Sequence, residues 1–201
     1  MSPISDIESK FKEYLDILSS EVKQADIHYK IFKGLFNSRL EDENLKAMNI
    51  APDFFMQTEY SHDICTLICM CKVYDQHRNS INIKNLVNYV EGNKDVFDKY
   101  GFDECNELVR QIFEDYQTEI ENLKTWRDKH IVHLDKNTKY TASHLETNFP
   151  VNPNKYEELI RSSMDILNCY SNKLMGKKYF DDVTLAVDDY QNVLEAIKKV
   201  S

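Results

Sequence analysis

The chain has 201 residues, of which 42% are hydrophobic and 29% charged, a balance typical of a globular protein with a substantial core. Its formal net charge is −9, from 25 basic and 34 acidic residues, which argues against a generic electrostatic binder of nucleic acid. Any contact with RNA must therefore come from a local positive patch.

Turn-forming residues are scarce, with only four glycines and four prolines. Such a chain has few places for tight turns, so we expect an all-α fold, as a single domain over residues 1–201. The opening residues MSPISDIESKF contain no apolar leader segment, and no apolar run approaches the roughly 20 residues that span a bilayer. We therefore expect a cytoplasmic protein without a membrane segment, whose five cysteines are free thiols.

A long first helix is predicted over residues 3–37, because apolar residues recur there at steps of three and four. This stripe consists of Ile7, Phe11, Leu15, Leu18, Val22, Ala25, Tyr29, Phe32 and Phe36. Residues 38–50 are polar and poorly periodic, which indicates a connection that could include a turn of helix. Pro52 suits the first turn of a second helix, running to about Asp75 and more apolar than the others.

A break at residues 76–80 precedes a short helix from about Asn82 to Glu91, which the pair Gly92-Asn93 ends. A further long helix is predicted over residues 103–134, followed by a long polar loop to about residue 154.

Two helices complete the chain, over about 154–175 with Gly176 as the stop, and over about 182–200 with Asp182 as the N-cap. The sequence thus predicts about five to six helices, without an internal repeat or a domain boundary.

Polar, chemically capable side chains are concentrated in the segment WRDKHIVHLD, residues 126–135, at the predicted end of the long helix. On an ideal helix Arg127 and His130 share a face, and His133 lies about 120° away from Arg127. An arginine side chain is long enough to cover that angle, so Arg127 and His133 can reach one groove.

These residue types suit RNA cleavage without a metal ion. A histidine moves protons near neutral pH, and the planar fork of an arginine matches two phosphate oxygens. A base that removes the ribose 2′-OH proton and a cation that stabilises charge at phosphorus are the minimum that the reaction needs. Asp128 could orient Arg127 or a histidine.

Simpler interpretations stand beside this one. A histidine near a helix end is often only a cap or a half-buried polar group. His130 and His133, three residues apart, could also bind a metal ion, but no Cys, Asp or Glu completes a recognisable ligand set. We therefore predict no metal site and no cofactor. Cys65, Cys69 and Cys71 lie on a predicted helix. Free cysteines on a helix more commonly pack as small buried hydrophobic residues than bind a metal ion.

The stretch RDKHIVH, with five residues between Arg127 and His133, resembles the signature of the HEPN superfamily. Together with the upstream stretch YDQHRNSINIKNLV, at residues 74–87, it is similar to the abortive-infection U-type (AbiU-like) branch of that superfamily. The resemblance covers about residues 10–175, with the C-terminal helix appended.

The resemblance implies a HEPN-type helical bundle with the R-x5-H motif at the end of a long helix. It further implies a metal-independent endoribonuclease toxin of a phage-defence (abortive-infection) or toxin–antitoxin system. By position, His133 is the acid/base residue, Arg127 stabilises the phosphate and Asp128 fills the polar motif position. His130 falls at a variable position.

Family members are typically homodimers whose two motifs form a composite cleft. The implied partners are RNA, with transfer RNA or messenger RNA as candidate substrates, a second copy of the chain and a cognate antitoxin protein.

Positive charge is in local excess around the motif. Residues 124–139 contain five basic residues, Lys124, Arg127, Lys129, Lys136 and Lys139, against two acidic ones, Asp128 and Asp135. We expect Lys124, Lys129, Lys136 and His130 to contribute to substrate binding.

Two alternatives remain. These lysines could merely offset the dipole of the helix end. The whole domain could be a non-catalytic HEPN module that binds RNA, a nucleotide or a partner protein, which the acidic net charge favours.

Overall fold

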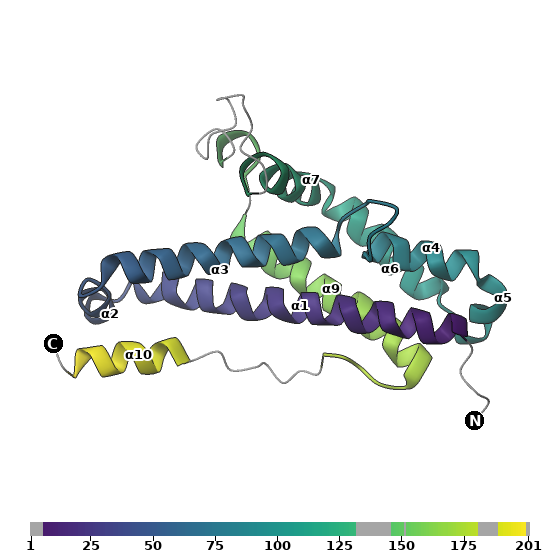
Figure 1. The fold of residues 1–201 in the computed structure, drawn as a ribbon, viewed down its shortest axis with the longest axis horizontal. Coiled ribbons are helices and arrows are strands. Elements are labelled where there is room, and N and C mark those ends of the chain that lie inside the picture. Colours follow the sequence, from purple (N-terminus) through teal and green to yellow (C-terminus); the bar gives the residue numbers. More distant parts are fainter. Residues whose placement is uncertain (1–5, 132–145, 151, 181–188, 200–201) are drawn as a thin grey trace.

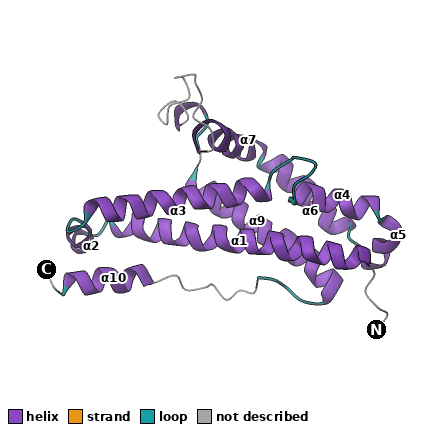
Figure 2. Cartoon of the chain, viewed as in Figure 1, coloured by secondary structure: helices purple, strands orange, loops and turns teal. Residues whose placement is uncertain are grey.

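The computed structural model describes residues 6–131, 146–150, 152–180 and 189–199, and in these ranges the regular structure is helical, with no strand (Figures 1 and 2). The all-α prediction is confirmed. The helices are α1 (Asp6–Ser38), α2 (Asp42–Met48), α3 (Pro52–Val73), α4 (Ile83–Gly92), α5 (Lys94–Phe97), η1 (Asp98–Tyr100), α6 (Asp103–Asp115), α7 (Gln117–Trp126), η2 (Arg127–Ile131), α9 (Pro153–Met175) and α10 (Asp189–Lys198).

The two longest N-terminal helices, α1 and α3, run antiparallel side by side and form the most extensive helix pair, and α9 also packs against α1 (Figure 1). The predicted stripe of α1 is buried from Phe11 through Tyr29. The stripe ends differently from the prediction, because Leu35 is buried and Phe36 is 52% exposed. The core therefore follows the helical period of α1 until its last turn.

The second helix, α3, begins at Pro52 as predicted and ends at Val73, with Tyr74 as its C-cap. The Tyr74 ring is buried, and its hydroxyl lies 2.9 Å from the Ser163 hydroxyl on α9. This buried hydrogen bond satisfies both polar groups and fixes the end of α3 against α9.

The short helix predicted from Asn82 is confirmed as α4. The Asn82 side chain caps it by accepting a hydrogen bond from the N–H of Asn85 at 2.7 Å. Residues 38–50, expected to be mainly a connection, contain the seven-residue helix α2.

The long helix predicted over residues 103–134 is not continuous. It breaks at Tyr116, whose backbone leaves the α-helical region (φ −115°, ψ 23°) between α6 and α7. The Tyr116 hydroxyl donates to Glu158 on α9 at 3.1 Å. Because of this break, α6 and α7 pack against different helices. α6 packs against α9, and α7 packs against α3.

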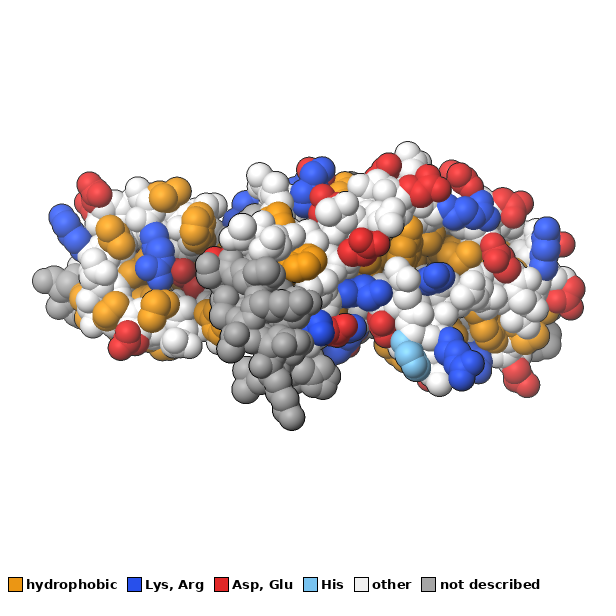
Figure 3. Space-filling view, turned by 90° about the horizontal axis from the view of Figure 1, so that it is seen from above, with side chains coloured by type: hydrophobic (Ala, Val, Ile, Leu, Met, Phe, Trp, Pro, Cys, Tyr) orange, Lys and Arg blue, Asp and Glu red, His pale blue; other side chains and the backbone are white. Residues whose placement is uncertain are grey.

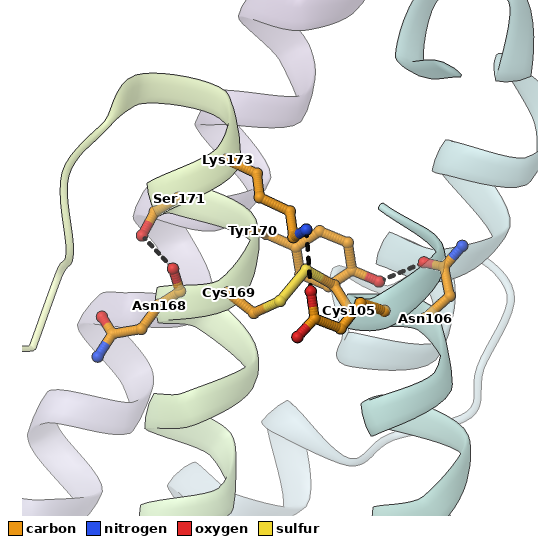
Figure 4. The surroundings of a disulfide bond; sticks show 8 residues. Cys105, Asn106, Asn168, Cys169, Tyr170, Ser171 and Lys173 are labelled. Atoms are coloured by element: carbon orange, nitrogen blue, oxygen red, sulfur yellow. Dashed lines mark hydrogen bonds and ion pairs between the residues drawn. A yellow bond between two sulfur atoms is a disulfide. The ribbon is translucent and has the colours of Figure 1, made fainter. Parts of the chain in front are cut away.

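The expectation of five free thiols is wrong for two of them. Cys105 on α6 and Cys169 on α9 form a disulfide, whereas Cys65, Cys69 and Cys71 are free (Figure 4). Beside it, the Tyr170 hydroxyl donates to Asn106 at 2.5 Å, again between α9 and α6. The pairing joins two helices that are far apart in sequence, and cysteine spacing alone does not reveal it.

The C-terminal helix α10 lies beside the end of α1 and α2 (Figure 1). It buries Leu194 in a small separate apolar cluster with Leu35, Ala47, Met48 and Phe55. The helix had been predicted to begin near Asp182, which lies outside the described residues. In the part of the chain that the structure describes, no helix is long and apolar enough to cross a membrane.

Candidate functional site around Arg127

The helix that leads to the motif, α7, is fixed at its C-terminal half by hydrogen bonds from two directions. The Cys71 thiol on α3 donates to the carbonyl of Leu123 at 3.3 Å. The Trp126 indole N–H donates to the carbonyl of Phe149 at 2.8 Å, and the Asn122 side chain donates to that of Pro150 at 2.9 Å. The start of the motif is thus anchored both to the core and to the segment that follows it in the chain.

At Arg127 the helix changes its winding. The N–H of Arg127 bonds the carbonyls of both Leu123 and Lys124, and residues Arg127–Ile131 form a π-helical turn. The ideal α-helix assumed for Arg127 and His130 is therefore wrong over these residues. Single π-turns within helices are rare and occur often at functional sites.

The Arg127 side chain is 25% exposed and lies between two carboxylates. Its Nε donates to Oδ1 of Asp128 at 2.7 Å, and its Nη1 lies 3.8 Å from Oδ1 of Asp75. The hydrogen bond with Asp128 raises the pKa of Arg127 above its ordinary value, so the guanidinium stays charged. An arginine has five N–H donors, so donors remain for a phosphate.

The sequence interpretation gave no role to Asp75. It lies two residues beyond the end of α3, at the break before α4, and its carboxylate points to Arg127 across the space between α3 and the π-turn. The sequence did contain a sign that Asp75 matters, because Asp75 belongs to the upstream stretch YDQHRNS on which the family resemblance partly rests. Only the packing of α7 on α3 shows that the two stretches meet.

The structure describes only some of the other residues that the sequence predicts for the site. Lys124 and Lys129 are half-buried and Asp128 is exposed. The backbone of His130 lies in the π-turn, but its side chain, His133 and Lys136 lie outside the described residues. The pairing of Arg127 with His133 in one groove therefore stays a prediction.

Two further basic residues, His77 and Arg78, lie exposed in the loop directly after Asp75. On the face seen in Figure 3, however, Lys and Arg side chains lie among Asp and Glu side chains and form no continuous basic patch over the described residues. Any attraction for a nucleic-acid backbone on this face is therefore local.

Within the described ranges, no three or more His, Cys, Asp or Glu side chains are arranged to hold a metal ion. The Cys71 thiol, which lies near Arg127, is buried, and burial raises its pKa to about 12, so it is neither a thiolate ligand nor a nucleophile at neutral pH. The chemistry available around Arg127 in this part of the chain is that of a cation and carboxylates.

The helical bundle, with an arginine-led motif on a π-turn after α7, defines a HEPN-type domain. The chain belongs to the AbiU2 family of HEPN proteins, since the family model HEPN_AbiU2 (AbiU2) matches residues 8–199. The match includes α10, beyond the stretch on which the resemblance in the sequence rests. No curated protein and no solved structure matches the chain significantly.

Proposed function

We propose that this HEPN domain is a metal-independent endoribonuclease that acts as a toxin in phage defence or in a toxin–antitoxin pair. The observation that carries the proposal is the state of Arg127, which is charged, partly buried and held by carboxylates on a π-turn at the head of the R-x5-H motif. A fixed cation of this kind costs little reorganisation when charge develops on a phosphate.

The proposed reaction is transfer of the phosphate within the RNA. A base, assigned to His133, takes the proton of the ribose 2′-OH, and the 2′ oxygen forms a bond to phosphorus while the bond from phosphorus to the 5′ oxygen breaks. The leaving 5′ oxygen takes up a proton from the acid partner. Arg127 stabilises the additional negative charge on the phosphate oxygens, and the products carry a 2′,3′-cyclic phosphate and a 5′-hydroxyl.

A homodimer would complete the site. Two copies that place their motifs face to face would supply two arginines and two histidines, so that one His133 can act as base and its counterpart as acid. Mixing wild-type protein with increasing amounts of the His133→Ala variant tests this arrangement. Cleavage that falls as the square of the wild-type fraction supports a composite cleft, because a mixed dimer lacks one of the two histidines, whereas a fall in simple proportion to that fraction contradicts it.

The experiment for the activity itself uses total cellular RNA with excess EDTA. Wild-type protein should produce discrete fragments within a time in which Arg127→Ala and His133→Ala produce none. Arg110→Ala is a matched control, because Arg110 also pairs with carboxylates, Glu107 and Glu91, but is exposed on α6. An intact RNA pool with the wild-type protein would contradict the proposal.

A second candidate is a non-catalytic HEPN module that binds RNA, a nucleotide or a partner protein. The interspersed acidic and basic side chains of Figure 3 and the net charge of −9 favour it, or else a narrow substrate such as one transfer RNA. Growth arrest on expression separates the candidates. Arrest that His133→Ala abolishes supports the enzyme, whereas arrest that survives the substitution supports the binding module.

A further inference from the structure

The Asp75 carboxylate is fixed by its own surroundings before Arg127 is considered. Its Oδ1 accepts a hydrogen bond from the backbone N–H of Gln76 at 2.9 Å, and its Oδ2 accepts one from the Ser80 hydroxyl at 2.8 Å. Burial acts to raise the pKa of Asp75, but hydrogen bonds from Ser80 and from the N–H groups of Gln76 and His77, with the charge of Arg127, outweigh it and lower the pKa. Asp75 is therefore a charged group held in one position.

The loop that holds Asp75 is itself fastened to α4. The Asn82 side chain, 1% exposed, donates to the Ser80 hydroxyl at 2.9 Å. The Asn85 side chain donates to the carbonyls of His77 and Ser80 at 2.9 and 2.8 Å. These bonds fasten His77 and Ser80 to the start of α4, so α3 and α4 together determine the position of Asp75.

Asp128, the other carboxylate beside Arg127, is placed differently. It is 49% exposed and adjacent to Arg127 in the sequence, whereas Asp75 is 21% exposed and comes from another part of the fold. An exposed ion pair contributes little and is readily exchanged with water, while a less exposed one is screened less by solvent and salt. At 3.8 Å Asp75 acts on Arg127 through charge and not through a hydrogen bond.

We propose that Asp75 is a positioning residue, which directs the Arg127 guanidinium toward the phosphate that is cleaved; this inference rests on the endoribonuclease activity proposed above. Asp75 does not contact the RNA, since a carboxylate repels a phosphate. Asp128 yields its hydrogen bond when the phosphate arrives, and Asp75 stays in place. The upstream YDQHRNS stretch thereby acquires a role as the support of the motif arginine.

The test is a double-mutant cycle in single-turnover RNA cleavage. Asp75→Asn keeps the shape but removes the charge and one of the two acceptor oxygens, so it retains only one of the hydrogen bonds from Gln76 and Ser80. It should lower the cleavage rate constant about tenfold or more, with a smaller change in KM. In an Arg127→Ala background the same substitution should change the residual rate less than about twofold, because its effect passes through Arg127. Ser80→Ala, which loosens the carboxylate, should give a smaller loss of the same kind.

The matched control is Glu59→Gln, which removes the charge from an arginine–carboxylate pair between α3 and Arg39, in the turn that follows α1. It should leave cleavage unchanged, and thermal unfolding checks that both variants remain folded. The inference is overturned if Asp75→Asn cleaves as fast as wild type, or if it slows cleavage equally with and without Arg127. A wild-type protein that cleaves no RNA overturns the proposed function, and this inference with it, so the two failures are distinguishable.

Discussion

Different forces hold the N-terminal end of α3 and the residues that follow its C-terminal end. At its N-terminal end, Phe55 is buried with residues from three other helices, Leu35 on α1, Ala47 and Met48 on α2 and Leu194 on α10. Burial of apolar area stabilises this end, and such packing is roughly proportional to area and has little direction.

At its C-terminal end, α3 leads to Asp75, whose neighbours are Ser80 and the cation of Arg127. The last turn of α3 is itself buried in the main core through Met70, Val73 and Tyr74. Hydrogen bonds and charges fix Asp75 just beyond it, and they require specific partners because a buried polar group left without one costs free energy. The apolar contacts of α3 thus provide stability, and the polar residues after its last turn provide chemistry. Substitutions in the apolar cluster around Phe55 should change the free energy of unfolding, and those at Asp75 and Arg127 should change cleavage.

The largest effect is expected at Arg127. Arg127→Ala should lower RNA cleavage about 100- to 1000-fold, the loss typical of a group that stabilises transition-state charge. The midpoint of thermal unfolding should move only a little, because one partner, Asp128, is exposed and the other, Asp75, lies 3.8 Å away, beyond hydrogen-bond distance. A variant that unfolds at much lower temperature would show that Arg127 is structural and would contradict the separation.

In the apolar cluster around Phe55, Leu194→Ala should lower the free energy of unfolding by about 2 kcal/mol, measured by urea denaturation. We expect the lower part of the usual range for a buried leucine, because Leu194 lies in a small apolar cluster separate from the main core. RNA cleavage should be unchanged. Val193→Ala, at a neighbouring residue that is 46% exposed, is the control and should have little effect on either quantity.

A smaller effect concerns Gly34, a glycine inside α1. A Cβ added there would lie 2.4 Å from Cζ of the Tyr190 ring on α10, so the glycine makes room for that ring. In a Tyr190→Ala background, Gly34→Ala should raise the free energy of unfolding by about 1 kcal/mol, the helix-propensity gain. With Tyr190 present the gain should be lost, and equal gains in both backgrounds would contradict the contact.

The smallest effect is on acid stability. The pKa of Asp75 is lowered from 3.8, so its charge contributes stability that is present above the ordinary value and lost as the pH falls through the lowered one. Asp75→Asn should therefore flatten the loss of stability below about pH 4. Asp16→Asn should do the same, since hydrogen bonds from Lys12 and Tyr179 outweigh burial and lower the pKa of Asp16 too, but it should not affect cleavage.

The sequence was sufficient for the features that depend on local periodicity. Spacing and end signals predicted the stripe from Phe11 to Tyr29, the start of α3 at Pro52 and the start of α4 near Asn82. The motif itself was also visible, because its residue types and spacing are a property of the sequence.

Features that depend on contacts between distant segments could not be predicted. The break at Tyr116 occurs where α9 provides a hydrogen-bond partner for the Tyr116 hydroxyl. The π-turn at Arg127 occurs where α7 packs on α3. The disulfide between Cys105 and Cys169 spans 64 positions. The approach of Asp75 to Arg127 likewise requires the packing of two helices that the sequence alone does not place.

The chemistry of the RNA ends tests the central claim most directly. Total RNA is incubated with the wild-type protein in excess EDTA, and both ends of every fragment are identified. The proposal predicts fragments with 5′-hydroxyl and 2′,3′-cyclic phosphate ends, which are absent with Arg127→Ala and present with Arg110→Ala. Intact RNA, or fragments that carry 5′-phosphates and appear with every variant, would contradict a metal-independent ribonuclease centred on Arg127.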